Sequence, residues 1–222
     1  MMDYGIFDIL GPVMIGPSSS HTAGAARLGK IAAQIAAGSF HKVEFLLYGS
    51  FAKTYRGHGT DKALVAGVMG MDPDDEHLRD SLYIAEKKGL QVEFVEVGMG
   101  DVHPNTVKFI FYKDNGAQVT VTGSSIGGGN ISIIEIDGDQ VEFSGQYPTI
   151  IVEHWDRKGM ISRISSVFAE AQINIATMKV NRSSRGEAAS MIIETDSDIN
   201  QEIVNKLKGI DEVIKVRAIQ PV

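Results

Sequence analysis

Glycine is spread unevenly along this 222-residue chain, and its distribution constrains the fold more than any other feature. Residues 1–146 hold 21 of the 24 glycines, whereas residues 147–222 contain only Gly159, Gly186 and Gly209. Glycine adopts backbone conformations closed to other residues, so clustered glycines indicate tight turns and close backbone approaches. The chain therefore divides into two expected domains, residues 1–146 and residues 147–222, with Gly and Pro at 143–148 marking the boundary.

The glycine-poor region shows a regular succession of strand and helix patterns. Strands are expected at 149–153, 175–181, 188–195 and 213–219, and helices at 159–171 and 198–208. Apolar residues recur at helical spacing in both helices, and Gly209 closes the second one. The order strand, helix, strand, strand, helix, strand predicts a ferredoxin-like βαββαβ unit.

The glycine-rich region mixes helix and strand patterns in a less regular order. Helices are expected at 22–37, 60–69 and 74–88, and strands at 43–48, 92–97, 106–112, 118–122, 131–136 and 140–143. This succession predicts a substantial sheet with helices packed on it. The whole chain is therefore expected to belong to the α+β class.

Composition excludes several classes of function. The chain has no cysteine, so it forms no disulfide and holds no cysteine-ligated metal or cluster by itself. A net charge of -7 argues against a nucleic-acid surface, which would be basic. The longest uncharged runs, 9–26 and 115–134, are rich in polar residues and glycine, so no membrane span is expected. No signal peptide is evident at the N-terminus, and a cytoplasmic protein is expected.

Two motifs place a histidine among hydroxyls or glycines. The segment Gly16–Gly24 (GPSSSHTAG) precedes an alanine-rich helix, and its hydroxyls and free backbone N–H groups would favour an anion. The segment Arg56–Asp61 (RGHGTD) flanks His58 with glycines, which leaves an accessible imidazole suited to proton transfer. A helix cap rich in serine and an ordinary loop histidine are the simpler interpretations.

Two further segments could complete a pocket. In Asp101–Asn105 (DVHPN), Pro104 holds His103 in an extended conformation, so that the segment could orient a ligand. In Gly123–Asn130 (GSSIGGGN), consecutive glycines could present backbone N–H groups to an anion, or could simply connect a hairpin. Together the four segments suggest a pocket for a small anionic metabolite.

The four motifs, in their order along the chain, resemble a known family. GPSSSHT followed by Gly24, GHGTD ending at Asp61, HPN ending at Asn105 and SIGGG ending at Gly129 resemble the beta domain of bacterial iron–sulfur L-serine dehydratases over residues 1–146. Residues 147–222 resemble an ACT domain, a regulatory ferredoxin-like module, through HWDRKGMI at 154–161 and AQINI at 171–175. This combination is similar to the two-chain, Bacillus-type enzyme.

The resemblance implies a lyase that works only in a complex. Such enzymes deaminate L-serine to pyruvate and ammonium, in amino-acid degradation or gluconeogenesis, with a 4Fe-4S cluster. The cluster needs thiolate ligands, so the absence of cysteine agrees with a heterodimer in which a separate alpha subunit carries it. ACT domains commonly pair, so self-association of this chain is also expected.

The resemblance also implies roles for individual residues. His21, His58 and Asp61 would be catalytic, with Asp61 orienting His58 or receiving the ammonium group. The substrate pocket would be formed by Ser18, Ser19, Ser20, Thr22, Asn105 and the glycines Gly127, Gly128 and Gly129. The likeness to the serine-binding ACT domain of phosphoglycerate dehydrogenase implies an effector site at His154, Asp156, Gly159, Asn174 and Ile175, although Asp156 stands where that relative has asparagine.

Two other functions stay open from the sequence. The chain could be a free-standing regulatory or amino-acid-binding protein, with an ACT sensor and a non-catalytic dehydratase-like domain. It could also be a lyase that acts on another hydroxy acid or amino acid.

Overall fold

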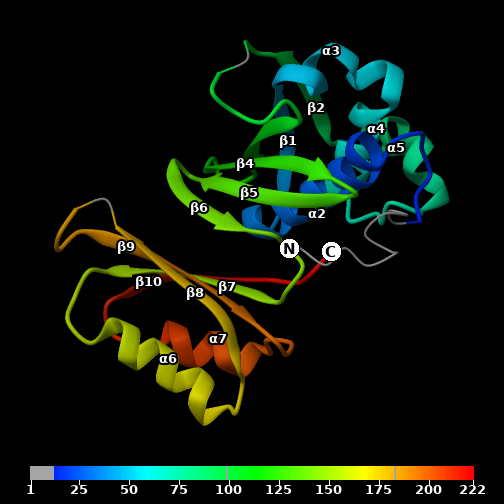
Figure 1. The fold of residues 1–222 in the computed structure, drawn as a ribbon. Coiled ribbons are helices and arrows are strands. Elements are labelled where there is room, and N and C mark those ends of the chain that lie inside the picture. Colours follow the sequence, from blue (N-terminus) through cyan, green and yellow to red (C-terminus); the bar gives the residue numbers. More distant parts are fainter. Residues whose placement is uncertain (1–12, 99, 183) are drawn as a thin grey trace. The chain divides into compact units, whose positions relative to one another are not determined.

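The computed structural model describes residues 13–98, 100–182 and 184–222. Residues 1–12, on which the expectation about a signal peptide rests, lie outside this range. The chain divides into two compact units between Ser144 and Gly145, two residues before the boundary drawn from the sequence (Figure 1). Among the described helices, none is both long enough and apolar enough to cross a bilayer.

The first unit is built on a six-stranded sheet in the order β2-β1-β3-β4-β5-β6. Strands β1 and β2 are parallel, and every other neighbouring pair is antiparallel. Alternate residues of the central strands are buried, as Val43, Phe45 and Leu47 of β1 show. The strands are β1 (Phe40–Leu47), β2 (Gln91–Glu96), β3 (Thr106–Lys113), β4 (Gln118–Gly127), β5 (Asn130–Ile136) and β6 (Asp139–Phe143).

The helices of the first unit gather against the buried face of this sheet (Figure 1). They are the π-helical turn η1 (Ser19–Ala23), α2 (Gly24–Ala36), α3 (Gly49–His58), α4 (Thr60–Val68), the 3-10 turn η2 (Glu76–Asp80) and α5 (Ser81–Lys87). Helices α2 and α4 touch backbone to backbone. A Cβ on Gly29 would lie 2.4 Å from the Leu64 carbonyl oxygen, and one on Gly67 would lie 1.9 Å from that of Ala26. Glycine is therefore required on both helices.

The structure differs from the sequence-based expectation in three elements of this unit. No helix was expected at 49–58, where α3 lies. The single helix expected over 74–88 is instead η2 followed by α5, because Asp80 (φ -104°, ψ 8°) leaves the helical conformation. Strand β4, expected to end at 122, continues to Gly127 because Gly123 and Ser124 pair with β3.

The second unit is the predicted βαββαβ arrangement, with sheet order β10-β7-β9-β8 and antiparallel neighbours throughout. Both helices cover one face, where Phe168 and Leu207 pack against Ile150, Met191 and Ile193. The ferredoxin-like prediction is therefore confirmed. The elements are β7 (Thr149–Trp155), α6 (Met160–Glu170), β8 (Ile175–Arg182), β9 (Ala188–Thr195), α7 (Gln201–Lys208) and β10 (Val213–Ile219).

Candidate active site

The serine-rich motif forms an unusually wide helical turn. Ser18 is extended (φ -143°), and its hydroxyl accepts a hydrogen bond from the N–H of His21 at 3.3 Å. The N–H of Gly24 then donates to the carbonyl of Ser19, five residues earlier, before α2 continues. Such π turns are rare and frequently occur at functional sites. Here the turn carries His21.

His21 is held through both ring nitrogens. Its Nδ1 lies 3.2 Å from Ser20 Oγ and 3.4 Å from Ser18 Oγ, and its Nε2 lies 3.2 Å from Ser50 Oγ. The residue is only 8% exposed. Burial lowers the pKa of His21, and the charge of neighbouring His58 lowers it further. The imidazole is therefore neutral at neutral pH and has a fixed orientation.

His58 is the exposed partner of His21. It is the last residue of α3, and the two imidazoles meet edge to face with ring centroids 4.8 Å apart. Gly59 adopts a left-handed conformation (φ 69°), which lets the chain pass directly from α3 into α4. The segment expected as a loop is therefore a junction between two helices. It brings together His21 and His58, the two histidines expected to be catalytic.

Asp61 lies in the first turn of α4. Its Oδ1 accepts a hydrogen bond from the N–H of Lys62 at 2.8 Å. Burial raises the pKa of Asp61, and the Lys62 N–H and charge oppose this shift. No hydrogen bond joins Asp61 to His58 in the part of the chain that the structure describes, so an orienting role has no contact to support it.

Ser50 is the hydrogen-bonding partner of His21 Nε2, and it was not among the residues expected from the sequence. Its N–H donates to the carbonyl of Pro104 at 2.7 Å. The preceding Gly49 (φ 53°) packs so closely that a Cβ there would lie 2.6 Å from the same oxygen. The DVHPN motif therefore places the start of α3, and with it the Ser50 hydroxyl. The available signal was a Gly-Ser pair directly after a predicted strand.

The remaining predicted pocket residues frame the helix rather than contact the histidines. A Cβ on Gly24 would lie 2.1 Å from Ser125 Oγ, so α2 starts in close contact with β4. Asn105 pairs with Ser125 through its carbonyl, at 2.9 Å, and its amide, at 3.5 Å. The glycines 127–129 form the β4–β5 turn, and Arg27 donates to the Gly129 carbonyl at 2.8 Å. This segment is thus the connection of the β4–β5 hairpin, and its contact with α2 is made through Arg27.

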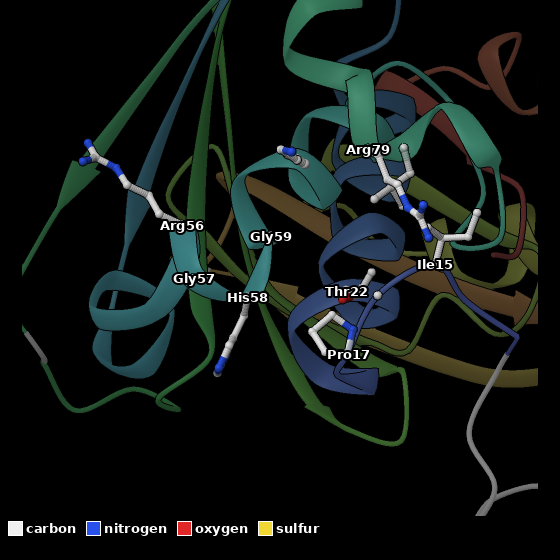
Figure 2. Close-up of a pocket in the computed structure, with 11 residues that line it drawn as sticks. Ile15, Pro17, Thr22, Arg56, Gly57, His58, Gly59 and Arg79 are labelled. Atoms are coloured by element: carbon white, nitrogen blue, oxygen red, sulfur yellow. The ribbon is translucent and has the colours of Figure 1, made fainter.

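A cavity of about 390 Å³ opens beside the histidine pair. Figure 2 shows its walls: the segment Ile15–Pro17, the turn Arg56–Gly59, and Arg79 from η2. Thr22 and Lys62 also line it. The cavity therefore includes Thr22, which was expected to bind the substrate, and His58, which was expected to be catalytic.

In the second unit, one end of the sheet carries three of the five predicted effector residues. The Asp156 carboxylate accepts hydrogen bonds from the Gly186 N–H at 3.0 Å and the Arg182 guanidinium at 2.8 Å, which lower the pKa of Asp156. His154 donates through Nδ1 to the Trp155 carbonyl at 2.9 Å. Gly159 is the N-cap of α6. Asp156 is thus already engaged within its own unit.

The other two predicted effector residues lie at the opposite end of that sheet. Strands β7 and β8 both run antiparallel to β9, so the start of β8 at Ile175 lies level with the start of β7. Asn174 donates there to the Asp196 carboxylate. Seven residues of β7 separate the two ends, which corresponds to about 20 Å. The five residues therefore do not form one site within a single unit.

The chain offers no thiolate ligand for an iron–sulfur cluster. It has no cysteine, and within the described ranges no group of three or more His, Asp or Glu is placed to hold a metal ion. Clusters of this kind depend on thiolates. The residues of this chain alone therefore do not fit the group that the family resemblance implies.

Fold and site define a two-unit α+β protein, in which a paired-histidine site beside a basic cavity precedes a ferredoxin-like module. Residues 5–89 match the family described as serine dehydratase beta chain, and residues 149–212 match the ACT domain. The L-serine dehydratase beta chain of Peptoniphilus asaccharolyticus is 38% identical over 221 residues, which cover 99% of this chain and 100% of the relative. This chain belongs to the family of L-serine dehydratase beta chains.

Two further relatives show how far this similarity extends. The probable L-serine dehydratase beta chain of Bacillus subtilis is 44% identical over 96% of this chain and 97% of its own length. The D-3-phosphoglycerate dehydrogenase of Methanocaldococcus jannaschii is 28% identical over 86% of this chain, but only 36% of that enzyme is covered. The similarity to the dehydrogenase thus includes most of both units of this chain.

Proposed function

We propose that this chain is the substrate-binding beta subunit of an iron–sulfur L-serine dehydratase, an L-serine ammonia-lyase of the cytoplasm. Its near full-length similarity to two dehydratase beta chains supports this proposal. The observation that carries the chemistry is the contact between buried His21 and exposed His58. One imidazole of this pair is accessible to a substrate, and the other holds it in place.

The proposed reaction is the loss of water from L-serine, followed by hydrolysis. A base removes the α-proton, the hydroxyl leaves with a proton as water, and aminoacrylate forms. Its imine tautomer then takes up water to give pyruvate and ammonium. His58 is the proposed base because it is exposed. The neutral ring of His21 packs against the His58 ring and adds no second positive charge when His58 takes up the proton.

The partner and the cluster belong to the same proposal. Because this chain has no thiolate, we place the 4Fe-4S cluster on a separate alpha chain, and the complex would be the active species. In the ACT unit, β8 and β10 are the two edge strands, and we propose that this unit self-associates and has a regulatory role. Its effector stays unassigned, because the predicted effector residues do not meet within one unit.

Anaerobic pyruvate formation from L-serine tests the proposal. It is measured with this chain alone and after mixing with a reconstituted cluster-bearing partner. Activity is expected only in the mixture. Activity of this chain alone would overturn the assignment of the cluster to a partner. No activity with an intact cluster in the mixture would instead support a free-standing regulatory protein.

A variant locates the reaction on the histidine pair. His58→Gln in the two-chain complex should lower kcat by roughly 100-fold or more, as expected for loss of a general base. His41→Gln is the matched control, since His41 is an exposed histidine that pairs with Asp114 at the far end of β1. Equal kcat in both variants would remove His58 from the catalytic residues.

A further inference from the structure

The cavity beside the histidine pair contains a buried hydroxyl without a partner. Thr22 is 2% exposed, and its Oγ1 has no hydrogen-bonding partner among the described residues. Gly16 keeps the chain tight against it, since a Cβ there would lie 2.3 Å from this oxygen. Buried hydroxyls in folded proteins are normally satisfied. Thr22 therefore has a hydrogen bond available for a molecule in the cavity.

Two basic side chains line the same cavity without ion-pair partners. Neither the Lys62 ammonium nor the Arg79 guanidinium forms a hydrogen bond or ion pair within the described part of the chain, although the Asp61 carboxylate is close to Lys62. Three other lysines of this unit are paired, namely Lys30 with Asp72, Lys42 with Glu93 and Lys108 with Glu135. The cavity thus has two cationic side chains that are not ion-paired within the described residues, in a chain with a net charge of -7.

The side chains around this cavity point in different directions. Figure 2 shows Arg79 beside Ile15 on one side, and the His58 ring projecting from the α3–α4 turn away from Arg79. The Arg56 guanidinium extends away from Thr22 and lies 5.3 Å from the Tyr55 ring centroid. Arg56 therefore contributes to the wall, while Lys62 and Arg79 supply the free charges.

We propose that this cavity binds a small oxyanion, a carboxylate or a phosphate, with Thr22 donating a hydrogen bond and Lys62 and Arg79 supplying positive charge. Two serines of the GPSSSHT motif are not free to bind an oxyanion in the same way. Ser18 and Ser20 are hydrogen-bonded to His21 and to each other. The oxyanion is accordingly assigned to the cavity rather than to the serine run that the sequence suggested.

Isothermal titration calorimetry of the full-length chain with inorganic phosphate tests the inference. Saturable binding is expected, and the double variant Lys62→Gln/Arg79→Gln should raise Kd by about tenfold or more, as for loss of charge-assisted hydrogen bonds. Lys53→Gln should leave Kd unchanged, because Lys53 is an exposed lysine of α3 outside the cavity lining. Absence of saturable binding, or equal Kd in wild type and double variant, would overturn the proposal.

A second variant separates binding from folding. Thr22→Val keeps the size of the side chain but removes its hydroxyl. It should weaken phosphate binding several-fold and raise the melting temperature without phosphate, because an unsatisfied buried group is removed. A misfolded variant would instead show both weaker phosphate binding and a lower melting temperature. Unchanged phosphate binding in Thr22→Val would contradict the role of this hydroxyl.

Kinetics of the two-chain complex identify the source of the oxyanion. Phosphate inhibition that competes with L-serine would mean that the cavity takes the carboxylate of the substrate. Non-competitive inhibition would mean that a separate oxyanion occupies it. Inhibition that is equally strong in the Lys62→Gln/Arg79→Gln variant would argue against the cavity altogether. Calorimetry on this chain needs no lyase activity, so failure of the proposed reaction would leave that test valid.

Discussion

Three hydroxyls surround the imidazole of His21, and the one on Ser50 comes from a different helix. Ser18 and Ser20 contact Nδ1, while Ser50 contacts Nε2. A ring that is hydrogen-bonded on both sides has a fixed orientation, while hydroxyl partners, which can donate or accept, suit either tautomer. The Ser50 contact therefore joins the start of α3 to the π turn. Because His58 is the last residue of α3, the same contact links the π turn to His58 through the helix.

Loss of this contact should impair turnover more than substrate binding. Ser50→Ala is expected to lower kcat of the two-chain complex about tenfold, the effect of losing one hydrogen bond that orients a functional group. KM should change little, and Ser50→Thr should restore most of the activity. Steady-state kinetics and an NMR titration of the His21 ring would check this. Unaltered kcat together with an unaltered titration curve would show that Ser50 does not position His21.

The lowered pKa of His21 predicts how stability depends on pH. Its pKa in the folded chain lies below the ordinary value of 6.5, so between the two values the unfolded chain binds more protons. The contribution to stability is complete above pH 6.5 and is lost as the pH falls through the folded pKa. Urea denaturation from pH 7.5 to pH 5 should show a steeper fall for wild type than for His21→Gln. Parallel curves would contradict the burial of a neutral imidazole.

Sequence reasoning found the histidines but assigned their neighbours less well. His21 and His58 stood out because hydroxyls and glycines surround each one locally. Ser50 did not, because its role depends on a contact across 29 residues of chain. Likewise Asp61, close to His58 in sequence, bonds instead to Lys62. Local pattern identifies which residue types are present, whereas the partners of a side chain depend on packing between elements.

At the level of elements, the contact between α2 and α4 sets the position of the site. The π turn with His21 starts α2, and the His58–Gly59 junction starts α4. Because Gly29 and Gly67 bring the two backbones together, no flexible side chain separates the helices. The distance between the two halves of the site is thus determined by backbone contact.

A methyl group at this contact should be strongly destabilising. Gly67→Ala would place a Cβ 1.9 Å from the Ala26 carbonyl oxygen, and overpacking against backbone is expected to lower the free energy of unfolding by about 2–3 kcal/mol. Gly57→Ala is the control, since no atom lies within 4 Å of a Cβ there. Its stability should stay the same or rise by less than about 1 kcal/mol. Chemical denaturation would measure both, and equal stabilities would show that α2 and α4 can move apart.

The sequence predicted the elements of the second unit closely, but not α3. In the second unit, apolar residues follow the periods of strand and helix because each element buries one face in a single core. Helix α3 is short, lies between Gly49 and Gly59, and carries Ser, Lys, Thr and Arg among its few apolar residues. Its N-terminus is stabilised by the Pro104 carbonyl, a contact that no local pattern reveals.

At the scale of the whole molecule, each unit encloses a core of its own. The second unit buries a cluster that includes Ile150, Phe168, Met191 and Leu207, all within residues 145–222. A fragment of residues 145–222 is therefore expected to fold alone, with a cooperative thermal transition and dispersed NMR signals. A fragment without a cooperative transition would show that this core needs residues from the first unit.

The cavity beside His58 shows why a binding site is harder to derive than a fold. Two of its walls come from the motifs at 16–24 and 56–61, but Lys62, Leu78 and Arg79 lie outside every motif found in the sequence. Arg79 drew no attention in the sequence because one arginine in an acidic helix resembles an ordinary surface residue. Its importance becomes clear only in the folded chain, where Arg79 lines the same cavity as Thr22 and Lys62.

The π turn at the start of α2 has a consequence for how this protein can change over generations. The Gly24 N–H reaches back five residues to Ser19, and each residue of a helix advances about 100° around its axis. Deleting one residue between Ser18 and Gly24 would convert the turn to ordinary α-helix and swing His21 away from Ser50. This stretch should therefore accept substitutions far more readily than insertions or deletions. Over evolution, the number of residues in the turn should change less than their identities.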